Sequence, residues 1–181
     1  MRELIHITAG TFRSRKLNIP DVDGLRPTSS RVREALFNIL GDIEGWRVLD
    51  LFSGSGLMAL ESLSRGASSV VSMEQHQQAC QSMRQVSQQF DVQSSWHIQK
   101  AVLPKALHGL QGETFDWVFA DPPYNCGLAE QISVWLTKEN IQWKQLVIEE
   151  SVRAKPQWAQ NINVKTRRYG DTNLHFLTHK E

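Results

Sequence analysis

An acidic residue followed by two closely spaced glycines occurs in the run Asp50-Leu51-Phe52-Ser53-Gly54-Ser55-Gly56. The run follows an expected short strand, 46–51, and precedes an expected apolar helix, 57–63. Glycine permits a sharp turn and the close approach of a ligand, and a helix start offers free N–H groups. Glu74 comes 18 residues after Gly56, at the end of the next expected strand. An acid in that place can accept hydrogen bonds from both ribose hydroxyls, so these residues predict a nucleoside-containing cofactor.

The acid before the glycines helps to choose among nucleoside cofactors. Gly54-x-Gly56-x-x-Ala59 also satisfies the dinucleotide fingerprint, so an NAD enzyme has to be considered. A carboxylate at Asp50 would serve a pyrophosphate poorly. S-adenosylmethionine has no phosphate, and its ammonium group tolerates a nearby acid. The sequence therefore favours S-adenosylmethionine, while a purely structural glycine turn stays open.

A second motif, Asp121-Pro122-Pro123-Tyr124, directly follows an expected strand at 115–120. In a parallel sheet this places the motif at the carboxyl edge, beside the first loop, where ligands bind. The prolines stiffen the loop, and the Asp121 carboxylate and Pro122 carbonyl can accept both hydrogens of a planar exocyclic amine. Stacking of a base on Tyr124 contributes ~1–3 kcal/mol. Such a site positions an amine for methyl transfer, and positioning can supply about 7–11 kcal/mol of rate acceleration.

Strands alternate with helical segments through most of the chain. Expected strands lie at 46–51, 69–73, 96–98, 115–120 and 146–148, and expected helices at 57–63, 75–90 and 128–136. This alternation predicts an α/β, Rossmann-like fold with a mostly parallel twisted sheet and helices on both faces. Gly170-Asp171 predicts an antiparallel C-terminal hairpin.

The N-terminal part has a different pattern. Residues 4–18 predict a β-hairpin around Ala9-Gly10, and a helix begins at Thr28 or Ser29 and ends at Gly41. Helical spacing predicts that Val32, Leu36 and Ile39 are buried. We therefore expect a small basic hairpin-and-helix extension at 1–41 and a cofactor-binding catalytic domain at 42–181.

Composition narrows the class of protein. The 181 residues include 20 Lys and Arg, 19 Asp and Glu, and two cysteines, for a net charge of +1. There is no signal peptide, membrane span or disulfide framework, so we expect a cytoplasmic protein that avoids membranes. The charge is segregated, with +4 over residues 1–33, −7 over 34–150 and +4 over 151–181. Basic ends favour a polyanionic partner.

The two motifs resemble class I S-adenosylmethionine-dependent methyltransferases that act on amino groups of bases. Further segments resemble, essentially end to end, the bacterial RsmD-type family of 16S rRNA guanine-N2 methyltransferases. These segments are Ile7-Thr8-Ala9-Gly10, Arg13-Ser14-Arg15-Lys16-Leu17, Leu25-Arg26-Pro27-Thr28, Arg31-Val32-Arg33-Glu34-Ala35-Leu36-Phe37-Asn38, Leu60-Glu61, Ser64-Arg65-Gly66-Ala67 and Tyr169-Gly170-Asp171-Thr172. The resemblance implies methylation of guanine N2 on the assembled small ribosomal subunit.

The resemblance also implies roles for particular residues. Asp121, Pro122 and Tyr124 would hold the guanine and carry the catalytic role. The cofactor would be bound by Asp50, Phe52, Ser53, Gly54 and Gly56 around its methionine end, by Glu74 at the ribose, by Ala101 near the adenine, and by Arg26, Thr28 and Arg31 from the N-terminal helix. Lys100 stands where many members have an acid or amide, so a backbone group is expected to read the adenine. Basic residues would hold the RNA, namely Arg13, Arg15, Lys16 and Arg33.

Other functions stay open at this point. An N6-adenine methyltransferase of DNA or RNA would use the same acceptor loop, although nothing in so short a chain resembles a sequence-reading domain. A non-catalytic RNA-binding or ribosome-assembly factor would use only the basic ends. An NAD dehydrogenase would lack room for a substrate domain. The six histidines have no metal-ligand spacing, so we expect no metal, and we expect a monomer.

Overall fold

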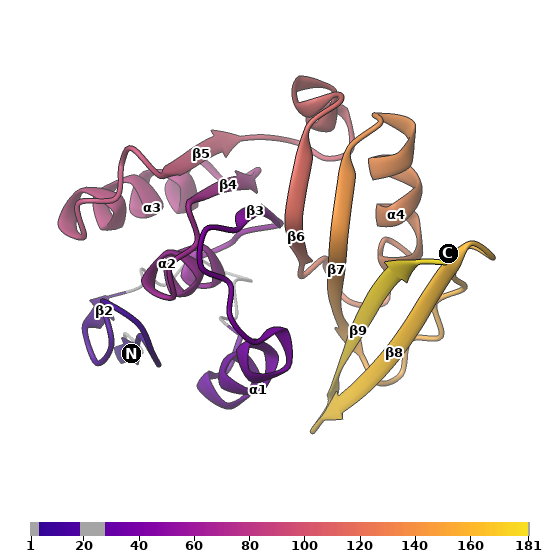
Figure 1. Cartoon of the computed structure of the whole chain (residues 1–181), viewed down its shortest axis with the longest axis horizontal. Helices are drawn as coiled ribbons and strands as arrows, with labels where there is room; N and C mark the ends of the chain where they lie inside the picture. Colours follow the sequence, from indigo (N-terminus) through magenta and orange to yellow (C-terminus); the bar gives the residue numbers. More distant parts are fainter. Residues whose placement is uncertain (1–3, 19–27, 181) are drawn as a thin grey trace. The chain divides into compact units, whose positions relative to one another are not determined.

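The computed structural model describes residues 4–18 and 28–180 and divides into two compact units, Met1–Ala101 and Val102–Glu181 (Figure 1). The extension expected at 1–41 lies within the first unit. Among the described residues, no helix is long and apolar enough to cross a membrane.

The first unit is built of a hairpin, a helix and three parallel strands joined by helical crossovers. Its elements are β1 (Leu4–His6), β2 (Lys16–Asn18), α1 (Ser30–Leu40), β3 (Arg47–Leu51), α2 (Leu57–Ser64), β4 (Ser69–Glu74), α3 (Gln77–Gln89) and β5 (Trp96–Lys100). Strands β1 and β2 pair antiparallel, and β4 lies between β3 and β5, parallel to both. The strand-to-helix turn predicted between 46–51 and 57–63 is present, and it follows β3 directly.

Helix α1 begins and ends as its sequence predicts. The Ser29 hydroxyl accepts a hydrogen bond from the Val32 N–H, and Gly41 ends the helix with a positive φ of 76°. The prediction that Ile39 is buried is wrong, because its side chain is 46% exposed. Phe37 is buried instead, at 1% exposure, so the apolar stripe runs through a neighbouring position of the helix.

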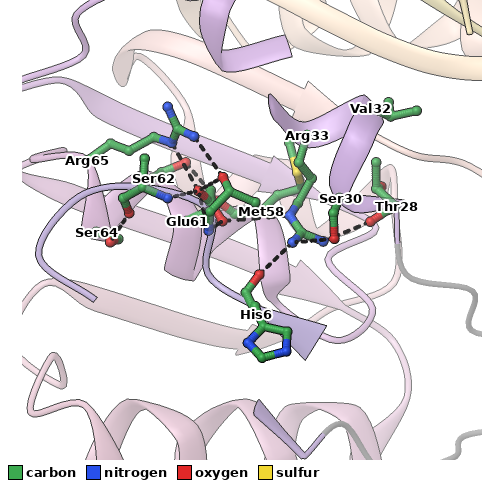
Figure 2. Close-up of polar contacts among 12 residues, drawn as sticks. His6, Thr28, Ser30, Val32, Arg33, Met58, Glu61, Ser62, Ser64 and Arg65 are labelled. Atoms are coloured by element: carbon green, nitrogen blue, oxygen red, sulfur yellow. Dashed lines mark hydrogen bonds and ion pairs between the residues drawn. The ribbon is translucent and has the colours of Figure 1, made fainter. Parts of the chain in front are cut away.

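The N-terminal hairpin is attached to α2 by a buried acid, Glu61 (Figure 2). Its carboxylate accepts hydrogen bonds from the N–H groups of Thr8 and Ala9, at 3.0 and 3.2 Å, and from the Thr8 hydroxyl. Arg65 donates to the same carboxylate at 3.0 Å, and Arg33 forms an ion pair with it at 3.7 Å. These contacts hold the hairpin, α1 and α2 together.

The second unit is a mixed sheet with one covering helix and a short 3-10 helix. Its elements are η1 (Lys105–Leu110), β6 (Thr114–Ala120), α4 (Ala129–Lys138), β7 (Gln142–Ser151), β8 (Ile162–Tyr169) and β9 (Thr172–His179). Strands β6 and β7 are parallel, whereas β9 lies antiparallel between β7 and β8. The predicted hairpin at Gly170-Asp171 is confirmed, because Tyr169 pairs with Thr172 across that turn.

Candidate active site

The glycine loop of the first unit is held by hydrogen bonds from its own backbone. The Ser53 N–H donates to the Met73 carbonyl at 3.0 Å, and the Gly56 N–H donates to the Ser53 carbonyl at 2.8 Å. Gly56 has a φ of +74°, and a Cβ there would lie 2.6 Å from the Trp96 ring and 2.7 Å from the Met83 side chain. A side chain at position 56 is therefore excluded both by backbone conformation and by space.

Asp50 is buried at the end of β3, with 2% of its surface exposed. The Ser72 hydroxyl lies 3.5 Å from its Oδ2, and that hydroxyl accepts a hydrogen bond from the Trp96 indole at 3.0 Å. Burial, together with the negative charge of Glu74, raises the pKa of Asp50 from 3.8 to about 7. A cation placed beside Asp50 would reverse this shift, because it stabilises the ionised carboxylate.

Glu74, at the end of β4, connects the glycine loop to the start of α3. Its Oε2 accepts the Gly54 N–H at 2.8 Å, and its Oε1 accepts the backbone N–H of His76 at 2.8 Å. The His76 ring nitrogen Nδ1 lies 2.7 Å from the same Oε1. The Glu74 carbonyl accepts the Ala101 N–H at 2.8 Å, so that backbone donor is already used within the protein.

The structure thus brings most of the predicted cofactor residues of the first unit to one end of β3 and β4. Phe52, inside the loop, has a positive φ of 58°, an uncommon conformation for a residue other than glycine. The Thr28 carbonyl accepts a hydrogen bond from Arg33 at 2.9 Å, and Arg31 is exposed on α1. Arg26 lies outside the described residues. Cofactor contacts of Thr28, Arg31 and Arg26 stay predictions.

The acceptor loop of the second unit follows β6 without a gap, as the sequence predicts. Pro122 is buried, whereas the Tyr124 ring is half-buried, with 38% of the residue exposed. The Tyr124 hydroxyl donates to the buried carboxylate of Glu149 at 2.8 Å and lies 3.4 Å from the Thr172 hydroxyl. One end of the tyrosine is therefore fixed to β7 and β9, while the ring retains an exposed surface.

Burial and the adjacent Glu149 carboxylate both raise the pKa of Tyr124 above its ordinary value. The phenol stays protonated at neutral pH and serves as a donor to Glu149 rather than as a base. Sequence reasoning missed Glu149. A signal for it was present, since the acids Glu149 and Glu150 directly follow the strand expected at 146–148.

Three of the four predicted RNA-binding residues are exposed on the N-terminal hairpin, and one is not. Arg13, Arg15 and Lys16 are exposed, and the Arg15 guanidinium lies 4.0 Å from the centre of the Phe90 ring. The prediction for Arg33 is corrected, because its side chain is only 1% exposed. Its NH2 donates to the His6 carbonyl at 2.8 Å (Figure 2). Arg33 stabilises the hairpin–α1 contact and cannot reach RNA.

The described parts of the chain meet the requirements of neither a metal centre nor a nucleophilic cysteine. Those parts contain no cluster of three His, Cys, Asp or Glu side chains suited to a metal ion. Cys80 is buried, and burial raises the pKa of its thiol. Cys126 is exposed beside the acceptor loop, and its Sγ donates to the Tyr124 carbonyl at 3.4 Å.

Comparison with known sequences gives matches that span most of the chain. The profile of the family described as Conserved hypothetical protein 95 matches residues 5–178. Ribosomal RNA small subunit methyltransferase D of Haemophilus influenzae is 35% identical over 161 residues, which cover 84% of this chain and 81% of the relative. The Escherichia coli protein of the same name is 34% identical, over 84% of this chain and 79% of the relative.

Comparison with solved structures confirms the predicted fold class. A protein from Escherichia coli, described as a methyltransferase candidate, is 28% identical with a TM-score of 0.85 and covers 98% of this chain and 99% of that one. A structure described as SMU.776, a methyltransferase candidate complexed with SAH, is also similar, at 12% identity and a TM-score of 0.66. That match covers 92% of this chain and 52% of the other, and it supports the fold alone.

Proposed function

The chain belongs to the Conserved hypothetical protein 95 family, the RsmD-type family that its motifs resemble, and on this basis we propose that it methylates guanine N2 in 16S rRNA with S-adenosylmethionine. The relatives are named as methyltransferases of small-subunit ribosomal RNA, which supports that substrate class. The proposal depends on one observation: the same chain contains a glycine loop that begins with an acid, Asp50, and an Asp-Pro-Pro-Tyr loop at 121–124.

The glycine loop fits S-adenosylmethionine by the chemistry of its donors and acceptors. Asp50 and Glu74 are both buried, at 2% and 5% exposure, and both are acceptors when ionised. A pyrophosphate would meet the Asp50 carboxylate, whereas the ammonium and ribose hydroxyls of S-adenosylmethionine would each meet an acceptor. Glycine at position 56 lets the loop pack tightly against Trp96 and Met83, which holds the loop in place at the ends of β3 and β4. We propose that Asp50 binds the ammonium and Glu74 the ribose.

The acceptor loop would hold the guanine. Tyr124, anchored through its hydroxyl to Glu149, offers a ring face on which the base stacks. The Asp121 carboxylate and Pro122 carbonyl accept the two N2 hydrogens and orient the nitrogen lone pair. The bound cofactor supplies an electrophilic methyl group on a sulfonium. Transfer of that methyl group to the N2 lone pair would leave S-adenosylhomocysteine, and the Asp121 carboxylate, which accepts an N2 hydrogen, would be placed to take the proton that N2 loses.

Access to the amine sets a requirement on the RNA. An exocyclic amine in a stacked, paired base cannot be reached by two loops of a protein, so the target guanine would be flipped out or already unpaired. We propose the assembled small subunit as the substrate. Exposed Arg13, Arg15 and Lys16 would bind its phosphates.

The experiment is a methylation assay with radiolabelled S-adenosylmethionine and small ribosomal subunits that lack the modification. We expect label in guanine of 16S rRNA, and no label after Asp121→Ala. Label in adenine of DNA or RNA would overturn the guanine assignment. A protein without a thermal shift on adding S-adenosylhomocysteine, and without transfer, would be a non-catalytic RNA binder.

Cys126→Ser is the matched control for this assay. Cys126 is exposed and lies in the same loop, so its substitution perturbs the same segment. Direct transfer from a sulfonium to an amine forms no covalent enzyme intermediate, and the variant is expected to keep wild-type activity. Loss of activity in this variant would contradict direct transfer.

A further inference from the structure

The chain has two tyrosines, and the second unit brings both to one residue, Thr172. The Tyr124 hydroxyl lies 3.4 Å from the Thr172 hydroxyl. Tyr169 is the direct partner of Thr172 in the β8–β9 register. Directly paired residues of an antiparallel sheet have side chains on the same face. Tyr169 therefore lies on the face of the hairpin that the acceptor loop contacts.

The same face continues along β8 as a basic row. Side chains alternate between faces along a strand, so Lys165 and Arg167 share the face of Tyr169. Both are exposed. Their direct partners on β9 are apolar, Phe176 for Lys165 and Leu174 for Arg167, so no cross-strand acid neutralises them. The two charges are about 7 Å apart along the strand, a spacing comparable with that of successive phosphates in an extended nucleic acid.

We propose that this face, formed by Lys165, Arg167 and Tyr169 and here called the β8 face, binds the RNA strand that flanks the target guanine. The inference rests on the proposed function, because it extends the guanine site at Tyr124. Tyr169 would stack a neighbouring base, since base–aromatic stacking tolerates any sequence. Lys165 and Arg167 would neutralise phosphates on the same strand.

The position of β8 also argues against a protein partner that adds a strand. In the sheet order of the second unit, β8 is the outermost strand, beside β9 (Figure 1). Every residue from Lys165 to Arg168 is exposed, and three of the four are basic. Charged side chains on an edge strand disfavour pairing with another strand. The same charges favour a polyanion, and the turn acid Asp171 is the one exposed acid of the hairpin.

The test measures binding of unmethylated small ribosomal subunits by filter binding across a range of KCl concentrations. The variant K165E/R167E reverses both charges of the β8 face, and Y169A removes the ring. The matched control K105E/K138E makes the same change in net charge at exposed lysines of η1 and α4 in the same unit. Affinity for S-adenosylhomocysteine and the melting temperature are measured for each variant as checks of folding, and K165Q/R167Q replaces K165E/R167E if that variant does not fold.

We expect K165E/R167E to weaken subunit binding by at least tenfold and to reduce the salt slope by about two, because two phosphate contacts are lost. Y169A is expected to weaken binding about tenfold without a change in slope. The control should bind like wild type. Wild-type binding by the β8 variants, with guanine methylation intact, would overturn this inference and leave the proposed function standing. Absence of methylation by the wild-type protein would instead overturn the proposed function itself.

Discussion

Lowering the pH from 7 to 6 is expected to weaken binding of S-adenosylmethionine about fivefold, because Asp50 must be ionised to bind the ammonium group. Asp50 is buried, and burial beside Glu74 raises its pKa to about 7. The ligand's ammonium stays protonated throughout this range. The change in affinity therefore reports on the protein's carboxyl group.

The magnitude follows from the ionised fraction of Asp50. A group with a pKa of about 7 is half ionised at pH 7 and about one-tenth ionised at pH 6. When only the ionised form binds, the apparent dissociation constant varies inversely with that fraction, which gives a ratio of about 5. Binding should also release about 0.5 proton at pH 7 and about 0.9 proton at pH 6.

Isothermal titration calorimetry in two buffers of different ionisation enthalpy measures both quantities. Asp50→Asn should bind weakly at both pH values and release no proton from this site. His76→Gln is the matched control, because the His76 ring lies 2.7 Å from Glu74 in the same loop region. Equal wild-type affinity at pH 6 and 7, or a pH dependence that persists in Asp50→Asn, would refute the assignment of the Asp50 carboxylate to the ammonium group.

Three further predictions concern the ligand-free protein and the acceptor loop. The pKa of Asp50 is higher in the folded than in the unfolded protein, so ionisation of Asp50 opposes folding, and the free energy of unfolding falls as pH rises from about 4 to 7. Urea unfolding should therefore show Asp50→Asn to be more stable than wild type at pH 8 by up to about 4 kcal/mol, and equal to it near pH 4. Arg33→Met leaves the buried Glu61 carboxylate with one guanidinium fewer and should lower the free energy of unfolding by about 3–5 kcal/mol. The double variant Arg33→Met/Glu61→Gln removes the buried charge as well and should largely restore that free energy. Tyr124→Ala should lower kcat/KM for small ribosomal subunits about 10- to 100-fold, because the base loses its stacking partner. Tyr124→Phe keeps the ring and should lower kcat/KM less than tenfold. Equal losses of kcat/KM in the two variants would reject stacking.

The parts of the fold that could be predicted from the sequence are those with a local cause. Ser29 and Gly41 bound α1 because a hydroxyl and a glycine satisfy helix ends wherever the rest of the chain lies. The turn at Gly170-Asp171 has a similarly local cause. Ile39 could not be placed in this way, since helical spacing indicates a stripe but not which edge of it meets the core. The partners of α1 decide that, and they are distant in the sequence.

The residues of the candidate site likewise fall into those with a local cause and those without one. Asp50, Glu74 and Tyr124 could be predicted because each lies at the end of a strand or in the loop after it, and strand ends define the carboxyl edge of a parallel sheet. Their supporting residues come from other strands. Ser72 reaches Asp50 from β4, and Glu149 reaches Tyr124 from β7. Such pairs depend on strand register, and no spacing within a single segment reports them.

Several of the segments that resemble the RsmD-type family, here called the N-terminal signature (residues 7–17, 31–38, 60–61 and 64–67), are in contact with one another in the structure. The separate segments containing Thr8, Arg33, Glu61 and Arg65 form one network of contacts, in which Glu61 is fully buried (Figure 2). Gly10 belongs to the same attachment, because a Cβ at that position would lie 1.7 Å from the Ser64 carbonyl oxygen.

Much of the signature therefore holds the hairpin on α2 instead of binding a partner. Because Glu61 faces two guanidinium groups, from Arg33 and Arg65, the charge that the first 33 residues offer to RNA is smaller than their net +4. Within the described part of this end, we expect phosphate contacts from Arg13, Arg15 and Lys16, which the attached hairpin holds exposed. A rigid attachment limits the conformational entropy lost when these side chains bind, so loss of Glu61 should weaken RNA binding although Glu61 is itself an acid.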